Sequence, residues 1–113
     1  MKPATPAHAT ALLVIDVQND FMEGGALGIA DASHILPVVN ERIASQDYSV
    51  IVATQDMHPE NHVSFSLWPP HCVRNTRGAE LHPGLLKDRV HVLWRKGVEA
   101  AVDSYGAFFD NEG

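Results

Sequence analysis

The stretch ALLVIDV, residues 11–17, decides the fold, because it is an apolar run interrupted only by Asp16. Such a run is typical of a strand buried on both faces, as in a parallel sheet covered by helices. Two further apolar runs, SVIVAT at 49–54 and VHVLW at 90–94, predict a second and a third strand. With a helix between the first two, the strands form a βαβ unit, whose strands are parallel and whose crossover is right-handed. The sequence therefore predicts an α/β protein built on a partial doubly wound parallel sheet.

The predicted helix covers residues 31–45. Its apolar residues recur at helical spacing: Ile35, Leu36, Val39 and Ile43. Asp31 or Ser33 is a candidate N-cap, and Pro37 is tolerable because it falls near the first turn. The stretch from 55 to 84 and the tail from 97 to 113 show no clear period, and we expect loops there.

Composition restricts the partners and the compartment. The 113 residues fit one domain or part of one, with 45% hydrophobic and 19% charged residues, as in a globular protein. The net charge of −6 and the lack of a Lys/Arg run argue against nucleic acid or an anionic membrane as main partner. Residues 1–10 do not resemble a secretory signal, and no segment has the apolar length of a membrane span. A single cysteine favours a reducing, cytoplasmic setting.

Charged side chains lie where the three predicted strands end. Asp16 is at the end of the first strand, Asp56 just past the second and Lys96 just past the third. Ligands of open parallel sheets bind at the carboxyl ends of the strands, so these residues are expected to converge on one cleft. The alternative is that the aspartates only punctuate turns and that Lys96 is a solvated surface charge.

The long loop is rich in metal-ligand side chains. It holds His58, His62, His71 and His82 directly after Asp56. Alternation in an extended chain puts Asp56 and His58 on the same side, and a carboxylate with two imidazoles suits Zn²⁺, Mn²⁺ or Fe²⁺. The alternative is that these histidines are surface residues or hydrogen-bond partners.

Cys72 is the single thiol. One interpretation is a nucleophile activated by a nearby cation. The favoured one is a small buried side chain packed behind His71, because a metal ligand next to it in sequence would point the thiol into the protein.

Several motifs together resemble one enzyme family. They are DVQNDF at 16–21, EGGAL at 23–27, DMHP at 56–59, NHVSF at 61–65, WPPHCV at 68–73 and KG at 96–97. GAELHP at 78–83 and DSYGAFFDN at 103–111 agree as well. In this order they resemble the bacterial nicotinamidase/pyrazinamidase group of the isochorismatase-like cysteine hydrolases.

The resemblance implies a three-layer α/β/α fold and an Asp-Lys-Cys triad. Asp16 matches the general base, and Lys96 matches the lysine that holds the thiolate and the developing charge. The positions of the metal ligands fall on Asp56, His58 and His71, with Zn²⁺ the first choice and Mn²⁺ or Fe²⁺ as alternatives. A histidine at the position of His62 ligates in some members only, so its role stays open.

The resemblance also implies the substrate. Phe21 and Trp68 match aromatics that flank a pyridine ring bound to the metal through its nitrogen, and Tyr105 lies in a segment of the same pocket. The expected reaction is hydrolysis of nicotinamide, or of pyrazinamide, to the acid and ammonia, as in NAD salvage. The metal-ligand pattern favours nicotinamide over isochorismate or a carbamoyl amine.

One element of the family pattern is not matched. The nucleophilic cysteine of the family follows the lysine, and Cys72 occupies another position. We therefore expect residues 1–113 to be the N-terminal portion of a single isochorismatase-like domain, inactive alone, whose open sheet edge could pair with a second chain. Two alternatives remain: a cysteine hydrolase with another amide substrate, and a non-catalytic metal-binding subunit.

Overall fold

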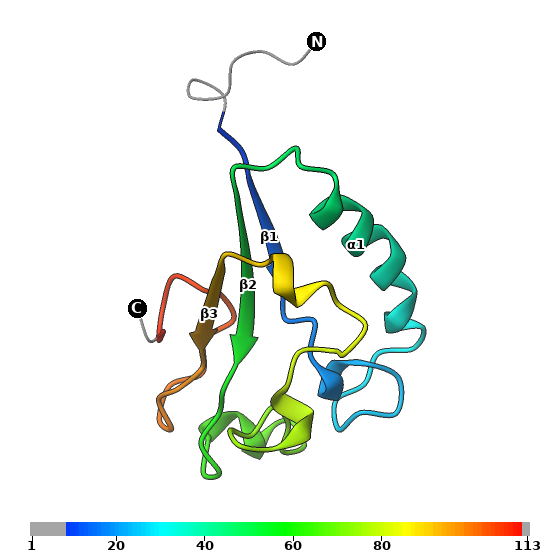
Figure 1. Ribbon diagram of the computed structural model, residues 1–113. Helices are drawn as coiled ribbons and strands as arrows, with labels where there is room; N and C mark the ends of the chain where they lie inside the picture. Colours follow the sequence, from blue (N-terminus) through cyan, green and yellow to red (C-terminus); the bar gives the residue numbers. More distant parts are fainter. Residues whose placement is uncertain (1–8, 112–113) are drawn as a thin grey trace.

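A three-stranded parallel sheet forms the centre of the computed structural model, which describes residues 9–111 (Figure 1). Its strands are β1 (Ala11–Ile15), β2 (Val50–Asp56) and β3 (Val92–Lys96), in the order β1-β2-β3. Both pairs are parallel, as predicted, with Leu13 opposite Val52 and Asp56 opposite Lys96. The sequence-based expectation that residues 1–10 are not a secretory signal falls mostly on residues 1–8, which lie outside the described residues.

The strand ends differ from the prediction in a way that matters for the site. β1 stops at Ile15 because Asp16 has a φ of 54°, a left-handed conformation that a strand cannot contain. β2 and β3 each run two residues further than expected. Asp56 and Lys96 are therefore the last residues of their strands, paired with each other, and do not follow the strands in loops.

The helix lies within its predicted range but begins differently. A 3₁₀ turn, Ala32–Ile35, leads into α1, Leu36–Ala44, and Pro37 falls in the first turn as expected. Asp31 occupies the N-cap position of the 3₁₀ turn, as one of the two predicted alternatives, but neither candidate side chain caps α1 itself, whose N-cap residue is Ile35. The backbone N–H and hydroxyl of Ser33 instead donate to the carboxylate of Glu23, at 2.9 and 2.5 Å, and Asp31 makes no side-chain cap bond.

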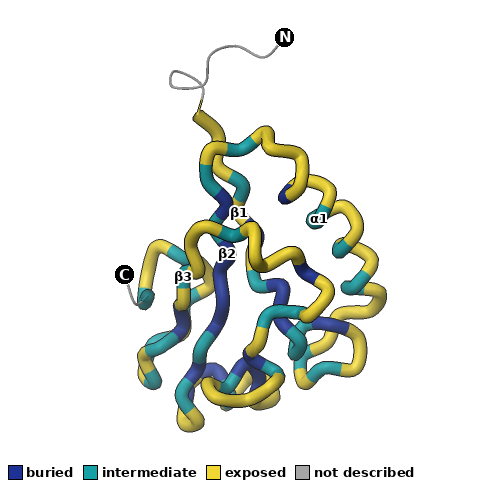
Figure 2. The backbone as a smooth tube through the Cα atoms, in the orientation of Figure 1, coloured by how far each residue is buried: buried dark blue, intermediate teal, exposed yellow. Residues whose placement is uncertain are grey.

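The core lies between the sheet and α1 (Figures 1 and 2). Val14, Ile51 and Ala53 point to this side and are at least 95% buried, together with Ile43 of α1. The alternate residues of β1 point the other way, and Ile15 is 64% exposed. Burial of this strand on both faces was therefore a wrong prediction for the described residues, where α1 covers one face only.

The segment from 55 to 84 is held in place by backbone hydrogen bonds and short 3₁₀ turns. Two such turns are Val63–Ser66 and Arg77–Ala79, and isolated bridges join His58 to Val73 and Gln18 to Leu81. Further short turns occur at Asn19–Phe21 and Lys87–Arg89. Residues 97–111 contain no helix or strand, as expected for a loop. Across residues 9–111, no helix has the length and apolarity needed to cross a bilayer.

Candidate active site and metal centre

A cavity of about 410 Å³ lies at the carboxyl ends of the strands, where the sequence places its charged residues. All eight residues predicted to form the site line this cavity: Asp16, Phe21, Asp56, His58, Trp68, His71, Lys96 and Tyr105. The three strand ends and three loops far apart in sequence thus contribute to one pocket. Their convergence agrees with the expected position of a ligand site in a parallel sheet.

Lys96 joins two carboxylates at the base of the cavity. Its Nζ lies 3.0 Å from Oδ2 of Asp16 and 2.5 Å from Oδ1 of Asp56, and the residue is only 4% exposed. Burial alone would lower the pKa of Lys96, but the hydrogen bond and charge of Asp56, with the charge of Asp16, raise it above its ordinary value. The ammonium therefore stays charged and links the end of β1 to the ends of β2 and β3.

The carboxylate of Asp16 is fixed by the neighbouring strand. The Thr54 hydroxyl donates to its Oδ1 at 2.7 Å. The backbone N–H of Asp16 is directed at the carbonyl and hydroxyl oxygens of the same threonine, at 3.2 and 3.1 Å. These bonds hold the left-handed turn at Asp16, and the second carboxylate oxygen, Oδ2, faces Lys96. The chemistry available to such a fixed, partly exposed carboxylate is proton transfer.

Asp56, His58 and His71 form a group that fits a divalent metal. Each offers one ligand atom, and these atoms lie within 4.8 Å of one another with all three residues buried. Nδ1 of His58 is 2.8 Å from the carbonyl of Gly97, and Nδ1 of His71 is 2.8 Å from the carbonyl of Pro69. A carbonyl only accepts, so both imidazoles carry their proton on Nδ1 and present the Nε2 lone pair, as metal-bound histidines do.

The charge state of His58 also suits a ligand. Burial lowers the pKa of this imidazole, more than the hydrogen bond to Gly97 and the charge of Asp56 raise it. His58 is therefore neutral near pH 7, the form that binds a metal.

His62 is placed next to this group but has a different hydrogen-bonding pattern. Its ring stacks on that of His58 with centroids 4.0 Å apart. Its Nδ1 accepts the backbone N–H of Ser64 at 3.2 Å and caps a 3₁₀ turn, whereas Nε2 is buried with no partner among the described residues. In the neutral ring the proton then lies on Nε2, which leaves no lone pair there for a metal.

Gln18 is a functional residue that the sequence reasoning missed. It is fully buried, and its side chain pairs with the backbone of Asp56 in both directions: Oε1 accepts the N–H and Nε2 donates to the carbonyl, each at 2.9 Å. Nε2 also donates to the carbonyl of Ala79 at 2.8 Å. Because β1 ends at Ile15, the Gln18 side chain makes the two hydrogen bonds to the Asp56 backbone that a neighbouring strand would otherwise make. The signal available was a glutamine directly after a predicted buried strand.

Gly97 has no room for a side chain. A Cβ there would lie 2.5 Å from Cε1 of His58, and the residue has a φ of 65°, which favours glycine. Its carbonyl accepts from the same imidazole. The residue after Lys96 thus supports a metal-ligand candidate.

Cys72 is a buried side chain, as the favoured interpretation predicted. It is 0% exposed, and its pKa is raised by burial and by the nearby carboxylates of Asp56, Asp20 and Asp16. The thiolate is therefore suppressed, opposite to what a nucleophile needs.

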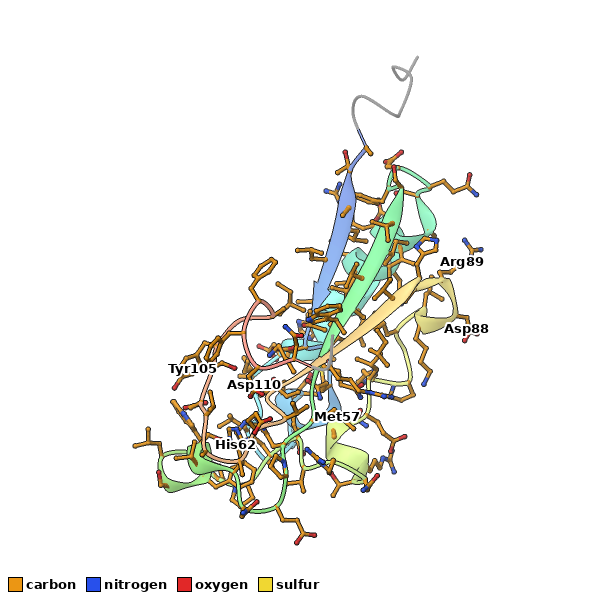
Figure 3. All side chains as sticks on the ribbon, turned by 90° about the vertical axis from the view of Figure 1, so that its left-hand side faces the viewer. Met57, His62, Asp88, Arg89, Tyr105 and Asp110 are labelled. Carbon is orange, nitrogen blue, oxygen red and sulfur yellow. The ribbon has the colours of Figure 1, made fainter. Side chains whose placement is uncertain are left out.

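Aromatic side chains form the outer part of the cavity. Phe21 packs against the His71 ring with centroids 5.7 Å apart, Trp68 is 44% exposed and Tyr105 is 80% exposed. Figure 3 shows His62 and Tyr105 toward the end of the molecule to which the strands point, away from Asp88 and Arg89. The rim is therefore open, with flat faces available to a ring-shaped ligand.

The class of the protein follows from the comparison with known families. The isochorismatase domain family matches residues 10–105, so this chain belongs to the isochorismatase family. The nicotinamidase of Acinetobacter baylyi is 40% identical over 124 residues. That match covers 92% of this chain and 57% of the relative, so the chain spans a little over half of the relative's length.

Solved structures agree with the fold. The L. infantum protein PnC1, solved in complex with nicotinate, is 38% identical with a TM-score of 0.86, over 99% of this chain and 59% of that one. The pyrazinamidase of Pyrococcus horikoshii, solved in complex with zinc, is 43% identical with a TM-score of 0.79, over 91% of this chain and 60% of that one. The fold is therefore isochorismatase-like and matches about 60% of these chains. The relatives named above include a nicotinamidase and a pyrazinamidase.

Proposed function

We propose that this chain carries the binding half and two catalytic side chains of a metal-assisted nicotinamidase. The observation that carries the proposal is that one cavity is lined both by the Asp16–Lys96–Asp56 chain and by the ligand group of Asp56, His58 and His71. The named relatives support nicotinamide as substrate, with pyrazinamide as an analogue.

The ligand group would hold Zn²⁺, or alternatively Mn²⁺ or Fe²⁺, which share a preference for imidazole and carboxylate donors. When bound, the metal would hold the pyridine nitrogen and so orient the ring. Phe21 and Trp68 supply flat apolar faces for that ring, and Tyr105 lies on the same wall. Zinc in a solved relative supports this assignment.

Asp16 and Lys96 would serve the covalent chemistry. In a complete enzyme a thiol attacks the amide carbon, its proton passes to Asp16, and ammonia leaves with a proton as the thioester forms. Water then cleaves the thioester, which gives nicotinate and restores the thiol. The Lys96 ammonium, held by two carboxylates, favours the thiolate and the negative charge on the attacked oxygen.

The thiol for this reaction is not Cys72. Its side chain does not line the cavity, and its raised pKa suppresses the thiolate. Cys72 is the only cysteine of the 113 residues, so we expect this chain by itself to bind the substrate without turning it over.

Calorimetric titration of the full chain tests the proposal. Nicotinamide should bind the Zn²⁺-loaded protein more tightly than the metal-free protein, and benzamide, which lacks the pyridine nitrogen, should not gain from metal. His71→Ala should abolish the gain. His82→Ala is the matched control, because this loop histidine does not line the cavity, and it should keep the gain.

Two outcomes would overturn the proposal. Equal binding of nicotinamide and benzamide would favour another amide substrate, and metal binding without any binding of nicotinamide would favour a non-catalytic metal-binding subunit. Ammonia release above a His71→Ala blank would overturn the assignment of Cys72 as inert.

We also propose a cytoplasmic location and self-association through the open edge of the sheet, at β1. A single buried thiol suits a reducing compartment. Leu13 and Ile15 supply apolar surface on β1, which has no strand beyond it among the described residues. Fractionation of the source cells tests the first, and sedimentation at two protein concentrations tests the second.

A further inference from the structure

The two imidazole ligand candidates are joined through the backbone of one residue, Cys72. The N–H of His58 donates to the carbonyl of Cys72 at 2.9 Å, and the N–H of Arg74 donates back to the carbonyl of His58 at 2.8 Å. The peptide nitrogen of Cys72 belongs to the bond with His71. Any shift of Cys72 therefore moves both imidazoles relative to each other.

The backbone of Cys72 is in a conformation that needs support. Its φ of 49° lies in the left-handed region, which residues other than glycine adopt rarely. The turn also follows two prolines, Pro69 and Pro70, which cannot donate backbone hydrogen bonds. An acceptor for the N–H of Cys72 is therefore important for the position of the turn.

Asp20 supplies that acceptor. Its Oδ2 accepts the N–H of Cys72 at 2.7 Å, and its Oδ1 accepts the N–H of Ala26 at 3.3 Å. The carboxylate comes from the loop that follows Asp16, 52 residues earlier in the chain than Cys72. Charge-assisted bonds of this length are among the stronger hydrogen bonds of proteins.

The carboxylate of Asp20 occupies the space that a side chain at position 78 would fill. A Cβ built on Gly78 would collide with both oxygens and with Cγ of Asp20. Glycine at 78 is thus required by the close approach of this side chain, because the φ of this residue is not in the left-handed region. The GAELHP segment and the DVQNDF segment therefore meet at the carboxylate.

We propose that Asp20 is a positioning residue of the metal centre, which sets the placement of His71 and, through the carbonyl of Cys72, of His58. This inference rests on the proposed metal site. Asp20 does not line the cavity and is not a catalytic residue. Partners of metal ligands typically change metal affinity by about 10- to 100-fold when removed.

Four variants of the full chain separate positioning from general stabilisation. Asp20→Ala removes the acceptor, and Asp20→Asn keeps one oxygen for the N–H of Cys72. Gly78→Ala displaces the carboxylate without removing it. Asn19→Ala is the matched control: it deletes a side-chain hydrogen bond of the same loop, from Nδ2 to the carbonyl of Arg77 at 2.9 Å, but makes no bond to the His71 turn.

The readouts are the dissociation constants of Zn²⁺ and Co²⁺, the visible absorption of bound Co²⁺, and the thermal unfolding of the metal-free proteins. We expect Asp20→Ala and Gly78→Ala to weaken metal binding by about 10- to 100-fold and to change the Co²⁺ spectrum. Asp20→Asn should retain the wild-type spectrum and lose less than about tenfold in affinity. Asn19→Ala should match the wild type in both.

Wild-type affinity and spectrum in Asp20→Ala would overturn the inference while leaving the metal site intact. An equal loss in Asn19→Ala would overturn it as well, because the effect would then be general. If Asp20→Ala is unfolded without metal, the spectrum of Gly78→Ala decides, and an unchanged spectrum in that variant would overturn the inference. A wild-type protein that binds neither ion would instead overturn the proposed metal site, and this inference with it.

Discussion

Proteins usually bury apolar side chains and expose charged ones. Two regions of this molecule do the opposite: the carboxyl end of the sheet and the face of the sheet that α1 does not cover. At the end of the sheet, Lys96 and Asp56 are charged yet only 4% and 8% exposed, and each has a close partner. On the face away from α1, Ile15 is apolar yet 64% exposed. Burial of charge is tolerated only where partners are present, whereas exposed apolar surface in proteins marks a place where contacts are made. The buried charges of Lys96 and Asp56 therefore have partners within the described residues, whereas the apolar face at Ile15 is left uncovered.

Lys96→Met should have the largest effect, because it leaves the buried carboxylate of Asp56 and the partly exposed carboxylate of Asp16 without their cation. Removal of one partner from a buried ion pair lowers the free energy of unfolding by about 3–5 kcal/mol. Urea unfolding at pH 7 measures it. The control is Lys87→Met, at an exposed 3₁₀ turn, which should change stability by less than about 0.5 kcal/mol.

The pH dependence of the same variant gives a second check. The pKa of Lys96 is raised in the folded state, so its stabilisation is fully present below the unfolded-state value, about 10.4. It is lost as the pH rises through the higher folded-state pKa. The difference between wild type and Lys96→Met should therefore be constant from pH 7 to about pH 10 and shrink only above that. A difference that shrinks below pH 9 would contradict the ion-pair explanation.

Two adjacent residues on β1 compare the covered and the uncovered face of the sheet directly, and we expect a smaller loss of stability there than in Lys96→Met. Val14 is 4% exposed in the core under α1, and Ile15 is 64% exposed on the other face. Val14→Ala should lower the free energy of unfolding by about 2 kcal/mol, because it leaves a cavity in packed surroundings. Ile15→Thr should change it by less than about 0.5 kcal/mol.

The protein concentration decides what a different result for Ile15→Thr means. Urea unfolding at two concentrations, about tenfold apart, should give the same midpoint for a monomer. If Ile15→Thr destabilises the protein only at the higher concentration, the uncovered face is buried between copies. A large destabilisation at both concentrations would contradict the exposure of Ile15.

The smallest expected effect concerns the Cys72 thiol, which should not react with a thiol reagent in the native protein. Its thiol is buried and its raised pKa suppresses the thiolate, so the native protein should not react with a thiol reagent at pH 8. Denatured protein should react with one equivalent and serves as the control. Rapid modification of the native protein would show that the turn at 71–72 opens readily.

The sequence predicted the helix, the three parallel strands and the set of residues at their carboxyl ends. Apolar runs report burial, so the strands were found, but the left-handed turn at Asp16 and the two-residue shifts of β2 and β3 were not. The turn at Asp16 and the end of β2 involve tertiary hydrogen bonds with Thr54 and Gln18, and β3 follows β2 as far as the Asp56–Lys96 pair. No local pattern contains these contacts. The prediction of Ser33 as N-cap was wrong because of another tertiary contact: its N–H and its hydroxyl both donate to the carboxylate of Glu23.

The site shows the same limit. Residue types and motif resemblance named eight of the residues that line the cavity, and their roles stay predictions. Spacing could not reveal the residues that act on the backbone of others, such as Gln18 on Asp56 and Asp20 on Cys72. It also gave no information on the tautomer of His62, which a bond to Ser64 determines.

Gly97 has a consequence for how this site tolerates change. The residue that follows the buried lysine also accepts the hydrogen bond of His58 and leaves no room for a methyl group beside that ring. A substitution at 97 would therefore disturb the ammonium and the imidazole at once, and no single replacement at either neighbour could repair both. One small residue therefore sets the local geometry of two neighbouring groups, the ammonium of Lys96 and the imidazole of His58.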